Sequence, residues 1–152
     1  MGLQLAPLTF PDLLLPPFMF TELVENTPWP HTAGSRTALG PFSGSSESRC
    51  IAELATPDRI LLVITADTST ALILERELPF FLDQPTDILA FPDWETLPYD
   101  NFSPHQDIIS ERLKTLHALP GIQAGIILIL PVNALLQKLT PRNYIDQHVL
   151  ML

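Results

Sequence analysis

A Ser- and Gly-rich segment, LGPFSGSSESRCIAELA (residues 39–55), has the composition of a phosphate-binding loop that leads into a helix. Such a loop follows the pattern G-x-x-x-x-G-K-[ST], in which Lys contacts the β- and γ-phosphates and Ser or Thr binds Mg²⁺. In parallel α/β domains, phosphates bind at a helix N-terminus, where unpaired backbone N–H groups point at the ligand. This segment is therefore the first candidate for a nucleotide site.

The segment departs from that pattern at the positions that nucleotide chemistry needs. With Ser48 at the Ser/Thr position, Glu47 stands where Lys belongs. A carboxylate at this position repels a triphosphate instead of attracting it. We therefore predict a degenerate nucleotide loop, and the alternative is an ordinary Ser/Gly-rich loop. The positions assigned to the degenerate loop are Pro41, Gly44, Ser45, Ser46, Glu47 and Ser48.

A second group of candidate residues lies in FPDWETLPYDNFSPHQDIISERL (residues 91–113), which follows a predicted strand. Nucleotide hydrolysis requires acidic residues that hold Mg²⁺ and activate water at a strand end. Asp93 and Glu95 are candidates, but one residue separates them, so on a continued strand their side chains would point to opposite sides. The alternative, which this spacing favours, is a solvated turn with Trp94 packed against the domain.

The remaining reactive residues form no pattern typical of a metal site or of nucleophilic catalysis. The four His residues lie far apart in the sequence, without an H-x-x-x-H pair. With a single Cys, Cys50, the chain cannot form an intramolecular disulfide. Proteins of the reducing cytosol typically lack disulfides. Cys50 falls on the predicted inner face of a helix, where we expect it to be buried and inert. No catalytic residue and no metal ligand are predicted.

The length and net charge of the chain limit its domain number and the kinds of molecule that it can bind. The 152 residues suffice for one domain with a hydrophobic core. The net charge is −9, and the eight Lys and Arg residues do not cluster, so a nucleic-acid-binding surface is not expected. A basic protein surface is the more plausible partner. Prolines interrupt the apolar N-terminus, no Lys or Arg precedes Arg36, and no apolar run reaches the roughly 18 residues of a membrane span. We therefore expect a cytoplasmic protein.

The elements that must position these residues alternate between strand and helix. Continuous runs of β-branched and Leu residues predict strands buried on both faces at residues 59–65, 87–91 and 125–130. Helical spacing predicts helices over residues 66–82, 103–119 and 131–139. A final strand is possible at residues 148–152. This order predicts an α/β domain with a mainly parallel sheet.

Two of the predicted helices have recognisable start signals. Asp67 is expected to cap the first helix. Ser103 is expected to cap the next one and to form a capping box with Gln106, with Pro104 at the first helical position. The buried stripe of that helix is predicted to consist of Ile109, Leu113 and Leu116, whereas Arg112 is expected to face solvent.

Proline content divides the chain in two. Residues 1–35 are Pro-rich, without periodic pattern, and are predicted to form an N-terminal arm. Residues 36–152 are assigned to the α/β domain. Because the sequence stops on the apolar stretch VLML, we expect this domain to be incomplete at its C-terminus.

The stretch DWETLPYDNFSPHQDIISERLKTLHALP, together with GIILILPVNALLQKL, resembles the N-terminal UvrB-like region (domain 1a) of the bacterial transcription-repair coupling factor family (Mfd). The resemblance runs from about Leu39 to Leu152. Trp94, Leu97 and Tyr99 are expected to lock the turn between strand and helix. The residues that carry the family motif, all with an expected structural role, are Asp93, Trp94, Glu95, Leu97, Pro98, Tyr99, Asp100, Ser103, Pro104, His105 and Asp107.

The resemblance implies a RecA-like fold of the P-loop NTPase type, similar to the nucleotide-binding domain of UvrB but without its ATPase activity. It implies a non-catalytic module that binds no cofactor and supports UvrA recruitment and autoinhibition in transcription-coupled nucleotide excision repair. In that family, UvrA binds mainly an adjoining inserted domain, and the module packs against the C-terminal domain. The full-length family protein is an ATP-driven DNA translocase that displaces stalled RNA polymerase, and its later domains bind RNA polymerase, DNA, ATP and Mg²⁺. The alternative is a small P-loop-like domain that binds or hydrolyses nucleotide through an atypical loop.

Overall fold

The structure is a computed structural model and describes residues 33–96 and 101–148. It divides into two compact units, which meet in the sequence between Gly44 and Ser45 and are described separately. Within the first unit, residues 33–44 form a turn at Ala33 and Gly34 and contain neither helix nor strand. Residues 1–32, which make up nearly all of the predicted N-terminal arm, lie outside the described residues.

The second unit is built on a parallel sheet of three strands in the order β1-β3-β2, in the part of the chain that the structure describes. The strands are β1 (Ile60–Thr65), β2 (Asp87–Ala90) and β3 (Ile126–Pro131). Leu62 of β1 and Leu89 of β2 lie on either side of Leu128 in the central strand. Each crossover between parallel strands contains a helix, as such connections require. The predicted α/β class with a parallel sheet is confirmed.

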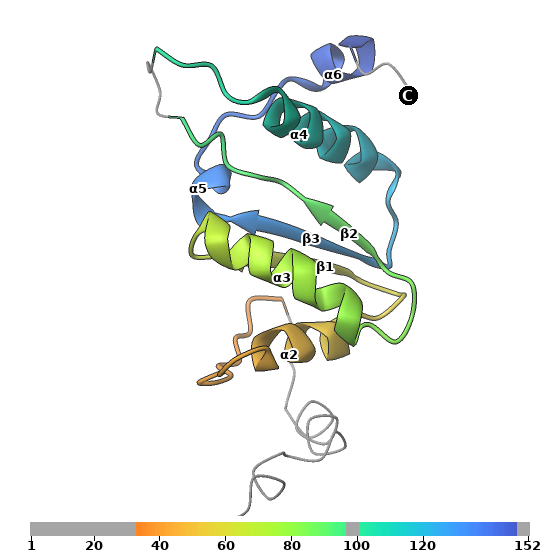
Figure 1. The fold of residues 1–152 in the computed structure, drawn as a ribbon. Coiled ribbons are helices and arrows are strands. Elements are labelled where there is room, and N and C mark those ends of the chain that lie inside the picture. The colour runs from red at the N-terminus through yellow and green to blue at the C-terminus, as the bar shows by residue number, and fades with distance from the viewer. Residues whose placement is uncertain (1–32, 97–100, 149–152) are drawn as a thin grey trace, which may run out of the picture. The chain divides into compact units, whose positions relative to one another are not determined.

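Helices cover both faces of this sheet (Figure 1). α2 and α3 lie on one side and α4 lies on the other. The helices, including the short 3-10 helix η2, are α2 (Ser46–Leu54), α3 (Thr68–Phe81), α4 (Gln106–Ala118), η2 (Leu119–Gly121), α5 (Val132–Leu135) and α6 (Arg142–His148). The helix predicted over residues 131–139 is thus reduced to the single turn of α5. Of the strand proposed for residues 148–152, His148 is the last residue of α6, and the others lie outside the described residues.

The start signals of α3 and α4 have different outcomes. Asp67 caps α3 as predicted, because its side chain accepts a hydrogen bond from the Thr70 backbone N–H at 2.7 Å. The prediction that Ser103 caps α4 is wrong. The cap is His105, whose Nδ1 accepts from the Asp107 backbone N–H at 3.3 Å. Because an imidazole nitrogen supplies the acceptor, the helix begins after His105, two residues later than predicted.

Two apolar clusters hold the helices to the sheet. The first joins α2 and α3 to the central strand and consists of Ala52, Leu74, Leu78, Ile127 and Ile129. The second lies on the α4 side and consists of Phe91, Leu130 and Ala134. Ile127 is fully buried, as expected for a central strand that is covered on both faces.

The prediction that β1 is buried on both faces is wrong. Ile60, Leu62 and Ile64 are each about half exposed, at 50%, 51% and 51%. β1 is an edge strand, and these side chains share the α4 face of the sheet, where α4 packs against β2. An apolar run identifies a strand but does not distinguish an edge from a centre. In the described ranges, no helix is long and apolar enough to cross a membrane.

Candidate functional site

The predicted nucleotide loop leads into α2 in the register that the sequence pattern implies. Ser45 is the N-cap, and the first turn contains Glu47, which is exposed, and Ser48, which is 1% exposed. A functional phosphate-binding loop follows a strand, but residues 33–45 contain none. Pro41 and Gly44 are exposed in the first unit, and Gly44 has a φ of +56°.

The hydroxyl at the Mg²⁺-binding position of the pattern is engaged in a hydrogen bond within the protein. Ser48 Oγ donates to Glu77 Oε2 at 2.6 Å, and Ser45 Oγ donates to the other carboxylate oxygen at 3.0 Å. A serine that binds Mg²⁺ must direct a lone pair at the ion. Ser48 is instead buried against a carboxylate of α3, which fixes α2 to α3.

Glu77 is a residue that the sequence analysis missed. It lies on α3 three residues after the buried Leu74, at the border of the apolar stripe, and is half-buried. A carboxylate beside an apolar helical stripe needs a polar partner. Ser45 and Ser48 supply that partner. The position of Glu77 beside buried apolar residues was the signal from which the sequence could have predicted such a contact.

Cys50 is also on α2 and is 3% exposed, as predicted. Burial raises the pKa of its thiol, and the neighbouring carboxylates of Glu47 and Glu53 raise it further. The reactive thiolate form is therefore disfavoured.

The two carboxylates that follow β2 do not converge on a common point. Asp93 Oδ1 accepts from the Trp94 backbone N–H at 2.8 Å and also from Gln137 Nε2. Glu95 is exposed and adopts a φ of +58°. Asp93 thus serves a hydrogen-bond network, and no described residue joins the pair in a group of three that could hold a metal ion.

Arg112 of α4 is the centre of that network, and the prediction that it faces solvent is wrong. Its side chain is 2% exposed. The guanidinium carbon lies 4.0 Å from the centre of the Phe91 ring and 4.1 Å from that of Trp94, so the group is stacked on two aromatic faces. Nη1 donates to the Pro92 carbonyl and, at 3.1 Å, to Gln137 Oε1.

These contacts explain how a guanidinium can be buried in the domain. A cation leaves water only when its donors are satisfied and its charge is compensated. Burial lowers the pKa of Arg112, and the nearby Asp93 carboxylate opposes that shift. We call the group the Arg112 cluster, and it consists of Phe91, Pro92, Asp93, Trp94, Arg112 and Gln137.

The Arg112 cluster gives a structural role to part of the family motif. Trp94 is half-buried and stacks on the guanidinium of Arg112. Leu97, Pro98, Tyr99 and Asp100 lie outside the described residues, so their expected role stays a prediction. Ser103 is exposed, and the exposed Asp107 carboxylate lies 3.2 Å from His105 Nδ1.

A cavity of about 440 Å³ lies beside the cluster. It is lined by Trp94, Thr96, Pro104, Ile109, Arg112, Leu113, Gln137, Thr140 and Tyr144. The lining is mostly apolar, and its one charged group, Arg112, is held by the contacts described above. Among the described residues that line it, none pairs a nucleophile with a base.

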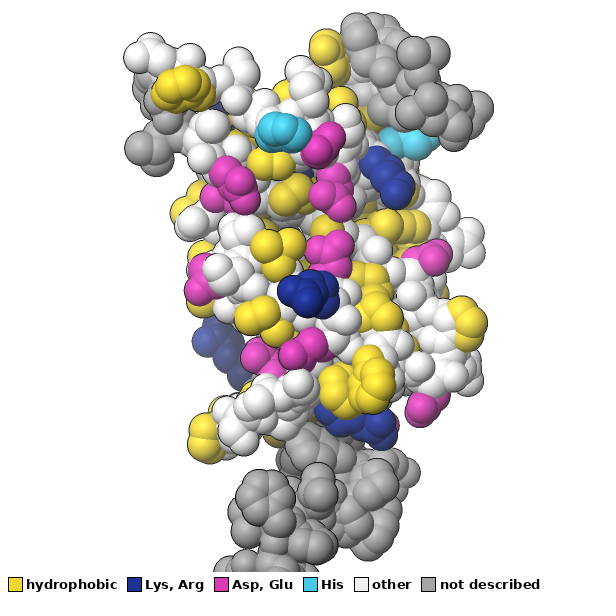
Figure 2. All heavy atoms as spheres, viewed as in Figure 1, with side chains coloured by type: hydrophobic (Ala, Val, Ile, Leu, Met, Phe, Trp, Pro, Cys, Tyr) yellow, Lys and Arg dark blue, Asp and Glu magenta, His cyan; other side chains and the backbone are white. Residues whose placement is uncertain are grey.

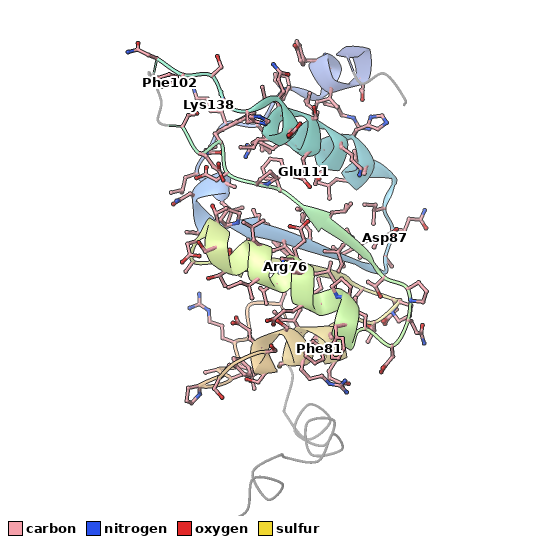
Figure 3. All side chains as sticks on the ribbon, in the orientation of Figure 1. Arg76, Phe81, Asp87, Phe102, Glu111 and Lys138 are labelled. Carbon is pink, nitrogen blue, oxygen red and sulfur yellow. The ribbon has the colours of Figure 1, made fainter. Side chains whose placement is uncertain are left out.

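Acidic side chains are spread over the face shown in Figure 2, which has no continuous patch of Lys and Arg. The charge of Glu111 on α4 (labelled in Figure 3) acts on the carboxyl group of Glu75 on α3. Burial raises the pKa of Glu75, and the Glu111 charge raises it further. A surface of this kind does not favour contact with nucleic acid.

The all-parallel sheet with helices on both faces defines an α/β domain compatible with the RecA-like and UvrB-like class. A comparison with protein-family models finds no match. Among curated proteins, the chain is 45% identical over 124 residues to the transcription-repair-coupling factor of Escherichia coli, which covers 81% of this chain and 10% of that protein. It is 43% identical over 115 residues to that of Haemophilus influenzae and 34% identical over 115 residues to that of Myxococcus xanthus, with 75% and 72% of this chain covered and 10% of each relative.

The chain therefore belongs to the family of transcription-repair-coupling factors. It spans about a tenth of the length of these relatives.

Proposed function

We propose that this chain is the N-terminal, non-catalytic module of a transcription-repair-coupling factor and acts in transcription-coupled nucleotide excision repair. The observation that carries the proposal is the 45% identity to the Escherichia coli factor over 81% of the chain. The full-length protein is an ATP-driven DNA translocase that displaces stalled RNA polymerase. In this proposal, ATP, Mg²⁺, DNA and RNA polymerase bind its later domains.

The geometry of α2 supports a module without nucleotide chemistry. Glu47 replaces the Lys that would contact phosphates, and the Ser48 hydroxyl is bonded to Glu77. Asp93 is held in the Arg112 cluster, so it is not available as a free Mg²⁺ ligand. With Lys absent, and with Ser48 and Asp93 engaged in other hydrogen bonds, the groups that phosphoryl transfer uses are not assembled here.

The surface supports contact with proteins. The net charge of −9 and the spread of acidic side chains disfavour DNA and favour a basic protein surface. We assign the module a supporting role in UvrA recruitment, with the main UvrA contact in an adjoining domain, and a second role in autoinhibition through contact with the C-terminal domain. The contacts by which the Arg112 cluster joins β2 to α4 suit a scaffold of this kind.

A chimeric protein tests this function. The matching segment of the Escherichia coli factor is replaced by this chain, and the chimera is produced in cells that lack the factor. We expect faster repair of the transcribed strand after ultraviolet damage, and low ATPase activity of the purified chimera without DNA, as in the parent. A chimera that accumulates normally but restores no strand bias, or that hydrolyses ATP without restraint, would contradict the proposal.

A further inference from the structure

The first turn of α2 holds an internal anion. Both oxygens of the Glu77 carboxylate are bonded there, one to the hydroxyl of the N-cap Ser45 and the other to that of Ser48. Backbone N–H groups at the start of a helix lack partners within the helix, and the helix dipole is positive at this end. A carboxylate near this turn is therefore favoured by the helix dipole, as a bound phosphate is, and the two serine hydroxyls hold it there.

The hydrogen bonds of the two serines are directed at Glu77 rather than at the helix itself. An N-cap serine normally accepts a bond from a backbone N–H of the first turn. Ser45 makes no such cap bond, and its hydroxyl donates to Glu77. Ser48 is buried with its hydroxyl in the shorter of the two bonds, at 2.6 Å. The contact between α2 and α3 is thus organised around the carboxylate.

We propose that Glu77 is a resident anion, which takes the place of a phosphate at the first turn of α2 and keeps that turn closed to phosphate-containing ligands. The exposed Glu47 in the same turn adds a second negative charge. Restoring Lys at position 47 would leave Glu77 in place, so this substitution alone should not restore nucleotide binding. This inference rests on the proposal that the module binds no nucleotide, and it concerns only the contact between α2 and α3.

Removal of the carboxylate should create a need for an external anion. The full chain is compared with its Glu77→Ala variant by thermal unfolding, in sodium phosphate and in sodium chloride of equal pH and ionic strength. Without phosphate, the variant should unfold at a lower temperature than the parent. Phosphate should recover part of the loss with saturation, and it should raise the melting temperature of the variant more than that of the parent.

Two further variants separate this effect from the general stabilisation that phosphate gives to folded proteins. Glu75→Ala removes a carboxylate from the same helix that has no hydrogen-bond partner among the described residues, so its response to phosphate should equal that of the parent. Glu77→Ser removes the carboxylate and leaves room for an anion while keeping a small polar side chain, and it serves if Glu77→Ala does not fold. It should lose stability, and it should gain more from phosphate than the parent does.

Equal gains in phosphate for the parent, Glu75→Ala and the Glu77 variants would overturn the proposal, and so would saturable phosphate binding to the parent. The proposed function is tested separately by the binding of ATP to the parent chain. A parent that binds no ATP, with Glu77 variants that phosphate does not rescue, would remove the resident anion and leave the proposed function intact.

Discussion

At the scale of single residues, the main structural feature is a buried arginine held without a direct carboxylate contact. The guanidinium of Arg112 lies between two aromatic rings and donates to a carbonyl and an amide oxygen, while Asp93 compensates its charge through Gln137. The cluster joins the end of β2, the middle of α4 and the segment after α5. One side chain thereby connects these three segments.

Replacement of Arg112 should therefore destabilise the domain strongly. Arg112→Ala should lower the free energy of unfolding by about 2–4 kcal/mol, because it removes two ring contacts and leaves buried acceptors without a donor. Arg112→Lys should recover only part, since an ammonium group cannot stack on both rings. Urea denaturation measures the loss, and Arg76→Ala on the exposed surface of α3 (Figure 3) is the control, with a change within about 0.5 kcal/mol. Equal effects of Arg112→Ala and Arg76→Ala would show that the cluster does not stabilise the turn.

Glu75 predicts a dependence of stability on pH. Its pKa is raised above the ordinary value of 4.5 in the folded protein, by burial first and by Glu111 second. The folded state therefore binds the Glu75 proton more tightly than the unfolded state, so this carboxyl contributes stability below pH 4.5 that is lost as the pH rises through the folded pKa. Glu75→Gln should raise the melting temperature at pH 7, and the gain should shrink toward pH 4. A gain that does not vary with pH would contradict this assignment.

At the scale of elements, the alternation of apolar runs and helical spacing was sufficient to predict the three strands and the parallel sheet. The position of each strand in the sheet was not predictable in this way, because IILIL and ILLVI are chemically alike. In the sheet, β3 pairs with a strand on each side, whereas β1 pairs only with β3 among the described strands. This difference depends on where the crossover connections place each strand, which the local sequence does not encode. The loop into α2 could be recognised from its pattern. The contacts of Glu77 and Arg112 could not be predicted, because their partners are distant in the sequence. Ser48 lies 29 residues from Glu77, and Gln137 lies 25 residues from Arg112.

The strand order makes a quantitative prediction. Ile127→Ala in the central strand should cost about 2–5 kcal/mol, because the side chain is fully buried and its removal leaves a cavity. Leu62→Ala in β1 should cost about 1 kcal/mol, since half of that side chain is already exposed. Chemical denaturation of both variants under the same conditions checks the order. Similar losses for the two would mean that β1 is covered as fully as β3.

At the scale of the whole molecule, the domain has layers compatible with a RecA-like fold, but the polar groups at the predicted nucleotide loop and after β2 hold the fold together. Ser48 fixes one helix to another, and Asp93 supports the buried arginine. Polar residues that could serve catalysis are thus satisfied within the protein. This arrangement suits a scaffold whose relatives are about ten times longer and whose activity, in our proposal, resides in later domains.

The central claim is that this domain has no nucleotide chemistry, and the binding of ATP tests it most directly. A fluorescent ATP analogue is titrated with the chain in the presence of Mg²⁺, and anisotropy is recorded, with a competent P-loop ATPase as the positive control. We predict no saturable binding, because Glu47 repels the triphosphate and Ser48 is bonded to Glu77. Saturable binding with micromolar affinity, displaced by unlabelled ATP, would contradict it.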